Sequence, residues 1–261
     1  TAVVIFQPAE EGGAGGRAMV EDGMMERFGI DEVYGMHNMP GTPAGAFRIR
    51  AGGIMAASDK FTIEIEGMGG HAAMPHNAVD PILIAAHVIT ALQTIVSRGV
   101  DPARAAVVSV TALKAGDAFN VIPRTVTMTG TARSLDESVR DFVEERIGTV
   151  ARGIAESFGG TATVRYERGY PVTVNAERET AYAASIAREI AGDSGVEEDT
   201  DPTMGGEDFS YMLQARPGAF IFLGNGDTGE LHSDDYDFND EIIPAGVSYW
   251  VRLVENASRA E

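Results

Sequence analysis

The hydrophobic and polar positions change their period near residue 58, which divides the chain into two kinds of structure. Before that point, short apolar runs at residues 2–6 and 33–37 are bounded by Gly, Pro or charged residues and predict buried strands. A helix can form between them over residues 16–28. From Ser58 onward apolar and polar residues alternate, which is the period of a strand with one face in water.

Residues 58–170 predict strand, helix, strand, strand, helix and strand in turn. Asp80 and Pro81 are a typical N-cap and first helical residue, and they open an amphipathic helix that ends near residue 99. Ser134 and Glu137 form a capping box at the start of the second helix. This order of elements is that of the ferredoxin-like split unit.

The last part of the chain returns to α/β character. It predicts a helix over residues 176–191, an apolar strand over residues 219–223 and a final helix that begins near Pro244. We therefore expect an α/β protein in which a smaller α+β domain is inserted into a larger one. The predicted boundaries are 1–57 plus 171–261 for the larger domain and 58–170 for the inserted one.

Charge and composition exclude several classes of partner. Lys and Arg total 20 against 39 Asp and Glu, and the net charge of −19 repels phosphate backbones and anionic membranes, so no nucleic acid and no membrane partner is expected. No apolar run approaches the about 20 residues that span a bilayer. The absence of Cys excludes disulfides and a thiol nucleophile in this sequence, and it is compatible with the cytoplasm, which is the location we expect.

The sequence begins at Thr1, with no Met and no leader, directly on an apolar run. A natural domain rarely begins in this way. We therefore expect that a segment upstream is missing.

Glu10 and Glu11 follow the first apolar run, in a segment that Pro8 and Gly12 shape on either side. Because the side chains of adjacent residues diverge, one carboxylate can bind a divalent metal while the other takes a proton from a water molecule. Metal-assisted hydrolysis requires this division of labour. The alternative is a solvated Glu pair in a loop.

Three histidines are candidates for the same chemistry. His37 ends the second predicted strand, where open α/β sheets place their ligands, and His232 follows a Gly-rich loop. His71 lies among glycines that allow close approach of the backbone. The alternatives are a structural His37, a surface His232 and a hairpin tip at His71, and a structural role is the default for His76 and His87.

Asn120 and Arg133 flank the Thr-rich strand of the inserted domain. Arg is suited to bidentate recognition of a carboxylate. The alternative is a turn Asn and an ordinary Arg at the end of a strand.

Taken together in this order, the motifs resemble the co-catalytic metallo-aminoacylase and carboxypeptidase family. The resemblance covers essentially all 261 residues and is strongest to the hippurate hydrolase and N-acyl-amino-acid amidohydrolase branch. Any one motif is weak, but seven in sequence make a chance resemblance improbable. The segments that carry it are residues 7–13, 35–40, 67–76, 118–123, 130–136, 204–210 and 231–233.

The resemblance implies a metallopeptidase-like catalytic domain with two divalent metal ions, Zn or Mn. It implies that Glu10 is the general base and that Glu11, His37 and His232 are metal ligands. The implied reaction is hydrolysis of the amide bond of N-acyl amino acids, such as hippurate, by a metal-activated water.

The resemblance also implies that the inserted domain is a lid and a dimer interface, so that the protein forms a homodimer through residues 58–170. His71 would reach the partner subunit's site and stabilise the oxyanion, and Asn120 and Arg133 would bind the substrate. The turn at residues 205–208 is implied near the pocket, without a defined role.

One departure from the family pattern limits the expected activity. The branch has a Cys and His pair upstream of the Glu pair, and nothing before Thr1 supplies it. We therefore expect this chain to bind metal poorly, with the two ions absent or only partly bound, and to hydrolyse slowly or not at all. The alternatives to a truncated amidohydrolase are an inactive fragment that dimerises without metal and a dipeptidase or carboxypeptidase, although His37 favours the amidohydrolase branch.

Overall fold

The computed structural model describes residues 1–258, which form two compact units. The first unit contains Thr1–Met55, Thr173–Thr203 and the described residues from Glu207 onward. The second contains Ala56–Val172 together with Met204–Gly206. Each unit has a hydrophobic core of its own.

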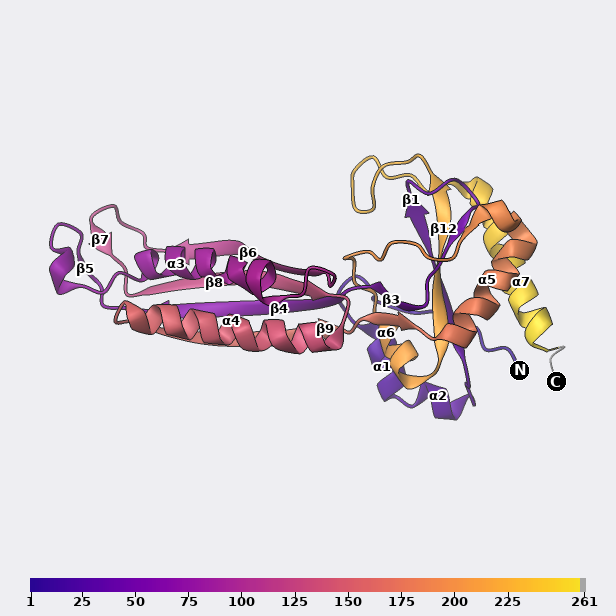
Figure 1. Cartoon of the computed structure of the whole chain (residues 1–261), viewed down its shortest axis with the longest axis horizontal. Coiled ribbons are helices and arrows are strands. Elements are labelled where there is room, and N and C mark those ends of the chain that lie inside the picture. The colour runs from indigo at the N-terminus through magenta and orange to yellow at the C-terminus, as the bar shows by residue number, and fades with distance from the viewer. Residues whose placement is uncertain (259–261) are drawn as a thin grey trace. The chain divides into compact units, whose positions relative to one another are not determined.

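A mixed four-stranded sheet forms the centre of the first unit. β1 and β12 run parallel and side by side (Figure 1), with Val33 opposite Gly218 and His37 opposite Phe222, whereas β12 and β2 are antiparallel. β12 is buried along almost its whole length, as expected for a strand with neighbours on both sides. The strand order is β1 (Val33–Pro40), β12 (Gly218–Gly226), β2 (Phe47–Arg48) and β11 (Val196–Glu197).

Helices cover both faces of this sheet. Ala219, Ile221 and Leu223 of β12 belong to one core cluster, and the alternate residues Phe220 and Phe222 belong to another, because successive side chains of a strand point to opposite faces. The first cluster includes residues of α5 (Glu177–Ala191) and α7 (Ile243–Ala257), and the second includes residues of α2 (Met24–Arg27) and α6 (Ser210–Ala215). α1 (Gly15–Glu21) packs beside α6, and β3 (Gly52–Met55) pairs with β10 (Thr173–Asn175).

Two predictions for the first unit were wrong. Residues 2–6 form no strand, and the side chains of Val4 and Phe6 are 77% and 85% exposed. An apolar run becomes a strand only where a neighbouring strand supplies hydrogen bonds, and no strand among residues 1–258 pairs with it. The single helix predicted over residues 16–28 is two helices, because the chain turns at Gly23 with φ of 80°.

The second unit is an antiparallel four-stranded sheet with two helices packed on one face. Its elements follow one another as strand, helix, strand, strand, helix and strand, and the spatial order β6-β8-β4-β9 is that of the ferredoxin-like split unit. In chain order they are β4 (Ala57–Glu66), α3 (Pro81–Thr94), β6 (Ala106–Ala115), β8 (Thr125–Ser134), α4 (Glu137–Ser157) and β9 (Thr161–Tyr170). A π-helical turn, Ile95–Gly99, extends α3.

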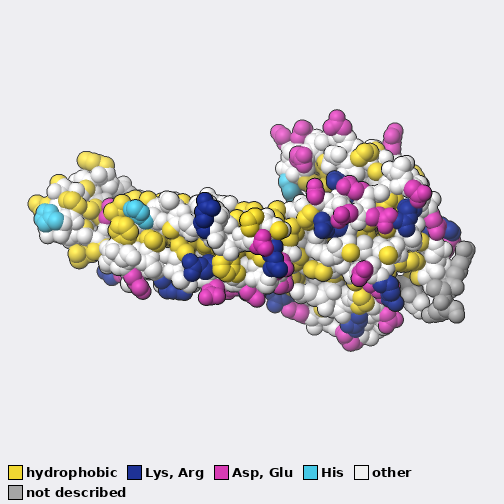
Figure 2. All heavy atoms as spheres, in the orientation of Figure 1, with side chains coloured by type: hydrophobic (Ala, Val, Ile, Leu, Met, Phe, Trp, Pro, Cys, Tyr) yellow, Lys and Arg dark blue, Asp and Glu magenta, His cyan; other side chains and the backbone are white. Residues whose placement is uncertain are grey.

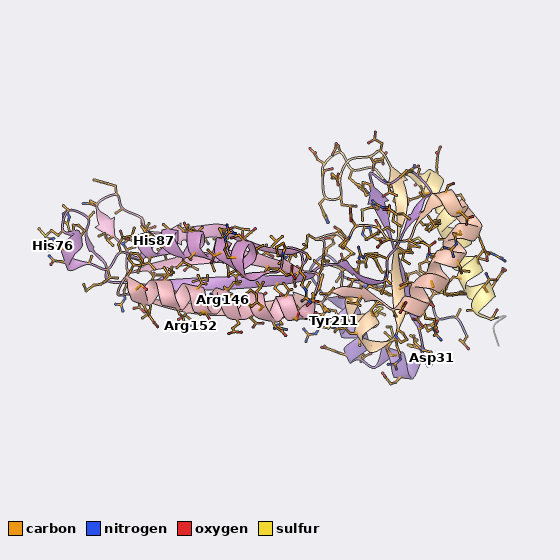
Figure 3. All side chains as sticks on the ribbon, viewed as in Figure 1. Asp31, His76, His87, Arg146, Arg152 and Tyr211 are labelled. Atoms are coloured by element: carbon orange, nitrogen blue, oxygen red, sulfur yellow. The ribbon has the colours of Figure 1, made fainter. Side chains whose placement is uncertain are left out.

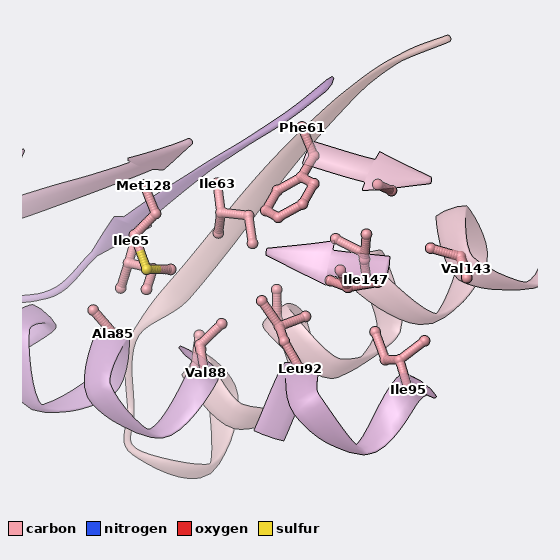
Figure 4. Packing of buried hydrophobic residues seen from close by; sticks show 14 of the residues in the cluster. Phe61, Ile63, Ile65, Ala85, Val88, Leu92, Ile95, Met128, Val143 and Ile147 are labelled. Atoms are coloured by element: carbon pink, nitrogen blue, oxygen red, sulfur yellow. The ribbon is translucent and has the colours of Figure 1, made fainter. Parts of the chain in front are cut away.

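Alternation along β4 and β8 builds the core of the second unit. Phe61, Ile63 and Ile65 of β4, with Met128 of β8, point toward the helices and are fully buried. Figure 4 shows these side chains against apolar residues of the two helices, among them Ala85, Val88, Leu92, Val143 and Ile147. A small β5 (Gly70–His71) and β7 (Val121–Ile122) pair, with the 3₁₀ turn Pro75–Asn77, lies beyond one end of the sheet (Figure 1).

The two helices of this unit begin at different kinds of cap. Asp80 caps α3 as predicted, with its carboxylate accepting a hydrogen bond of 2.9 Å from the Ile82 amide. The capping box predicted for α4 was wrong. Asp136 caps that helix by accepting from the Ser138 amide at 2.8 Å, and the buried Ser134 hydroxyl has no hydrogen-bond partner.

Within residues 1–258, one helical stretch, Pro81–Gly99, is long and apolar enough to cross a membrane by length and composition alone. This corrects the expectation that no apolar run approaches that length. One such helix is weak evidence for a membrane span, because a core helix of a soluble protein passes the same test. Here its buried residues, including Ile84 and Leu92, pack in the core of the second unit.

Candidate active site

The segment that carries Glu10 has an unusual backbone. Ala9 and Ala14 adopt positive φ values of 52° and 51°, which residues with a side chain seldom do, and Gly12 has φ of 117°. Two backbone hydrogen bonds close the turn, a short one from the Gly12 amide to the Glu10 carbonyl at 2.6 Å and an ordinary one from the Gly13 amide to the Ala9 carbonyl at 2.9 Å. Such strain persists only where the surroundings hold it, and it is frequent at functional sites.

Three carboxylates converge beside this segment. One oxygen each of Glu10, Glu207 and Asp208 lies within 4.8 Å of the others. Glu207 and Asp208 are 4% and 0% exposed, and they precede α6 in the chain. In the part of the chain that the structure describes, this is the only group of three or more acids or histidines close enough to share a cation.

The two buried carboxylates accept hydrogen bonds from the segment and from their own turn. Gln7 Nε2 donates to Glu207 Oε1 at 2.9 Å and, in a very short contact, to Asp208 Oδ1. The Gly16 amide donates to Asp208 Oδ2 at 2.7 Å, and the Phe209 amide donates to Glu207 Oε1 at 2.9 Å. These bonds offset part of the cost of burying two charges.

Glu10 is poised between its two protonation states near neutral pH. Burial first, and then the charges of Glu207, Glu11 and Asp208, raise its pKa to about 7, against the lowering effect of a hydrogen bond from the Asp208 backbone. A carboxyl group with a pKa near the working pH is suited to take up a proton and release it again.

Of the predicted metal ligands, the structure brings two together. His232 Nδ1 lies 3.7 Å from Glu11 Oε1, and both side chains are largely exposed. His37 lies on β1, where its Nδ1 is 2.5 Å from the Asn38 carbonyl oxygen, so a proton on Nδ1 leaves Nε2 free to bind a metal. Within residues 1–258, none of these three residues belongs to a group of three close ligand atoms.

The predicted residues of the second unit lie at two opposite ends of its sheet. His71 and Asn120 lie in adjacent segments, since the Ala72 amide donates to the Asn120 carbonyl at 3.0 Å, and both residues are exposed. The Ala73 amide donates to His71 Nδ1 at 3.1 Å. Arg133 lies at the far end of β8, opposite Ser58, and burial lowers its pKa. One copy of this unit therefore does not bring His71 and Arg133 together.

His76 and His87 also lie in the second unit, and Figure 3 shows them apart, with His76 near β5 and His87 on α3. The His87 ring stacks on Phe158, with 4.7 Å between ring centroids. This packing supports the structural role expected for His87.

Sequence reasoning gave no role to Glu207 and Asp208. They are adjacent acids after two glycines, as Glu10 and Glu11 are adjacent acids in a Gly-rich segment, and this parallel is the feature that points to them. Acidic pairs are common elsewhere in the chain, however, and Figure 2 shows Asp and Glu side chains over much of the visible surface of the first unit.

The model of peptidase family M20/M25/M40 matches residues 1–256. The chain belongs to this family. The resemblance inferred from the seven motifs is thus confirmed, as is the α/β fold with mixed sheets.

Relatives of this M20-family chain include a hydrolase, a deacetylase and a dinuclear metal binding peptidase. Hippurate hydrolase of Campylobacter jejuni subsp. jejuni is 41% identical over 248 residues, which are 95% of this chain and 65% of the relative. N-acetyl-L-cysteine deacetylase of Bacillus subtilis is 40% identical over 257 residues, 98% of this chain and 60% of the relative. A dinuclear metal binding peptidase from the M20 family of Bacillus subtilis has a similar structure, with a TM-score of 0.80 and 31% identity over 95% of this chain and 62% of that one.

The M20-family chain therefore spans about 60 to 65% of the length of these curated relatives.

Its own residues fit divalent metals by the chemistry of their donors. Glu11 offers carboxylate oxygens, and His37 and His232 offer ring nitrogens, a mixture that suits divalent transition metals. The three carboxylates around Glu10 add the negative charge that attracts such ions.

Proposed function

We propose that this chain is part of a metal-dependent amidohydrolase that cleaves the amide bond of N-acyl amino acids. The observation that carries the proposal is Glu10, a carboxyl group with a pKa of about 7, next to the Glu11 and His232 pair. Relatives at about 40% identity that hydrolyse hippurate or deacetylate N-acetylcysteine support the same reaction type.

In this proposal Glu10 accepts a proton from the attacking water and later delivers it to the leaving amine. Glu11, His37 and His232 would hold two divalent ions, Zn or Mn, which when bound polarise the water and the acyl carbonyl. Glu207 and Asp208 raise the proton affinity of Glu10, so that it can both take and return the proton near neutral pH.

We propose that residues 1–57 plus 171–261 act as the catalytic domain and residues 58–170 as a lid and dimerisation domain. Residues 125–132 of β8 separate the Asn120 end of this unit from Arg133, which corresponds to about 27 Å of strand. In this proposal His71 stabilises the oxyanion of the substrate that Arg133 binds. Because one copy of the unit holds these two residues far apart, two copies are needed. This separation supports a homodimer.

There are two alternatives to an active amidohydrolase. An inactive fragment would dimerise through the second unit without binding metal, and a dipeptidase or carboxypeptidase would use the same site on a peptide. A cytoplasmic location is part of the proposal, and the absence of Cys in the sequence is compatible with it.

The decisive experiment measures metal content after loading with Mn²⁺ or Zn²⁺, together with hydrolysis of hippurate, other N-acyl amino acids and dipeptides. Glu10→Gln should keep the bound metal and lower kcat by about 100-fold to 10,000-fold, because it removes the proton acceptor. Turnover of N-acyl amino acids that survives this substitution would rule out Glu10 as the base. A dimer with neither metal nor turnover would establish the inactive alternative, and faster cleavage of dipeptides would establish the peptidase.

A further inference from the structure

One buried carboxylate holds both ends of the segment that carries Glu10. Asp208 Oδ1 accepts a very short hydrogen bond from the Gln7 side chain, and Asp208 Oδ2 accepts one of 2.7 Å from the Gly16 amide. Gln7 precedes the segment at residues 8–15, and Gly16 follows it in the first turn of α1. The Asp208 side chain is 0% exposed, so water does not compete for these bonds.

The segment between these two anchors needs to be held. Ala9 and Ala14, on either side of the Glu pair, both have positive φ, which a free chain would relax. The anchor at Gly16 is tightly packed, since a Cβ added there would lie 3.0 Å from the Asp208 carbonyl oxygen and 3.1 Å from Oδ2. A side chain at this position would require Asp208 to shift by a few tenths of an ångström.

Asp208 also touches the proposed base directly. A hydrogen bond from its backbone reaches the Glu10 carboxylate. The contacts of Glu207 differ, because its Oε1 accepts from Gln7 and from the Phe209 amide of its own turn. Of the two buried acids, Asp208 is thus the one that bonds to both anchors of the segment.

We propose that Asp208 is a positioning residue, which clamps the strained segment at residues 8–15 through Gln7 and Gly16 and so fixes Glu10 for proton transfer. The inference deepens the proposed function and rests on it for the role of Glu10. Each oxygen of Asp208 accepts a hydrogen bond from one anchor of the segment. In the proposed function Glu11, His37 and His232 would be the metal ligands, so the role proposed for Asp208 is a different one.

The test compares hydrogen exchange of the peptide that contains residues 7–17 with steady-state kinetics, in the metal-loaded full chain. Asp208→Asn keeps only one of the two acceptor oxygens and places an NH₂ group where the other one accepted a hydrogen bond. One anchor of the segment is then lost, so amide hydrogen exchange in residues 7–17 should be about tenfold faster or more. The value of kcat should fall about 100-fold with little change in KM, because Glu10 is displaced while the residues that bind the substrate stay in place. Metal content should stay as in the wild type.

A second substitution tests the clamp by restoring it. In the double variant Asp208→Asn with Gln7→Glu, the new amide can donate to the new carboxylate and still accept from the Gly16 amide, so exchange protection and kcat should partly return. Glu179→Gln is the matched control, because Glu179 is a buried acid of the same unit that bonds to Arg178. It should change neither the exchange of residues 7–17 nor kcat.

Gly16→Ala tests the same clamp if Asp208→Asn does not fold, since the added methyl group pushes against Asp208 and should also speed exchange. The proposal would be overturned if residues 7–17 of a folded Asp208→Asn or Gly16→Ala variant exchanged at the wild-type rate. It would also be overturned if such a variant lost its bound metal while these residues still exchanged at the wild-type rate. The exchange result does not depend on turnover. If the wild type hydrolyses none of the substrates, the proposed function fails, but hydrogen exchange still shows whether Asp208 holds the segment.

Discussion

Glu10 is the residue whose ionisation should set the pH dependence of hydrolysis. Burial and three neighbouring carboxylates raise its pKa to about 7. A general base must be deprotonated to accept a proton, so kcat/KM should rise with pH through the pKa of Glu10, which bound divalent ions would lower from about 7, and then level off. Kinetics of the metal-loaded protein on hippurate over roughly pH 5 to 9 would show this rise.

Glu207→Gln provides the comparison for that profile. It removes the largest of the neighbouring charges that raise the pKa of Glu10, so the rise in kcat/KM should move to lower pH. Glu197→Gln is a suitable control, because Glu197 is an exposed acid whose partner is Arg48. A profile that shifts equally in both variants would show that the effect does not come from Glu207.

At the residue scale, sequence reasoning found the part of the site that a local motif marks. Glu10 and Glu11 stand out because they are adjacent acids in a short segment shaped by Pro and Gly. Glu207 and Asp208 did not, because the bonds that join them to Gln7 connect positions 200 and 201 residues apart. The pattern of one chain gives the period of each element but not which loops meet.

At the element scale, strongly periodic segments were predictable and weakly held ones were not. The helix predicted over residues 176–191 is observed as Glu177–Ala191, because one face of it packs in the core. Residues 2–6 have the composition of a strand, but the outcome depended on whether a neighbour supplied hydrogen bonds. Near Gly23 the apolar spacing continued, while a single positive φ ended the helix.

The start of α4 offers a stability test at this scale. Asp136 accepts hydrogen bonds from the Ser138 and Val139 amides, whereas the Ser134 hydroxyl has no partner. Asp136→Ala should therefore lower the free energy of unfolding by about 1 kcal/mol. Ser134→Ala should lower it less, because no hydrogen bond is lost. Urea unfolding measures both, and the reverse order would restore Ser134 as the cap.

At the scale of the whole molecule, the change of hydrophobic period carries most of the information. Alternation begins near Ser58 because only one face of β4 packs against helices, so buried and less buried residues alternate along the strand. Met204–Gly206 belongs to the same unit, with the Ala56 amide donating to the Gly205 carbonyl at 2.9 Å. Three residues without regular structure show no period, so the sequence does not reveal where they pack.

The second unit contains a buried ion pair on which its own stability should depend. Asp59 and Arg140 are joined at 2.6 Å with side chains 2% and 5% exposed, and the Tyr166 hydroxyl donates to Asp59 at 2.8 Å. Burial alone would lower the pKa of Arg140, but the hydrogen bond and charge of Asp59 raise it overall. Asp59→Ala leaves the buried guanidinium without its main partner, which should cost about 3–5 kcal/mol.

Calorimetry can assign that loss to one unit. Because each unit has its own core, two unfolding transitions are expected, and Asp59→Ala should lower one of them by roughly 10 °C or more while the other stays in place. Asp141→Ala is the matched control: its bond to Arg168 is also 2.6 Å long, but Asp141 is 66% exposed, and such pairs contribute about 0–1 kcal/mol. If Asp59→Ala moved both transitions together, the two units would unfold as one, and the division seen in the structure would not be an energetic one.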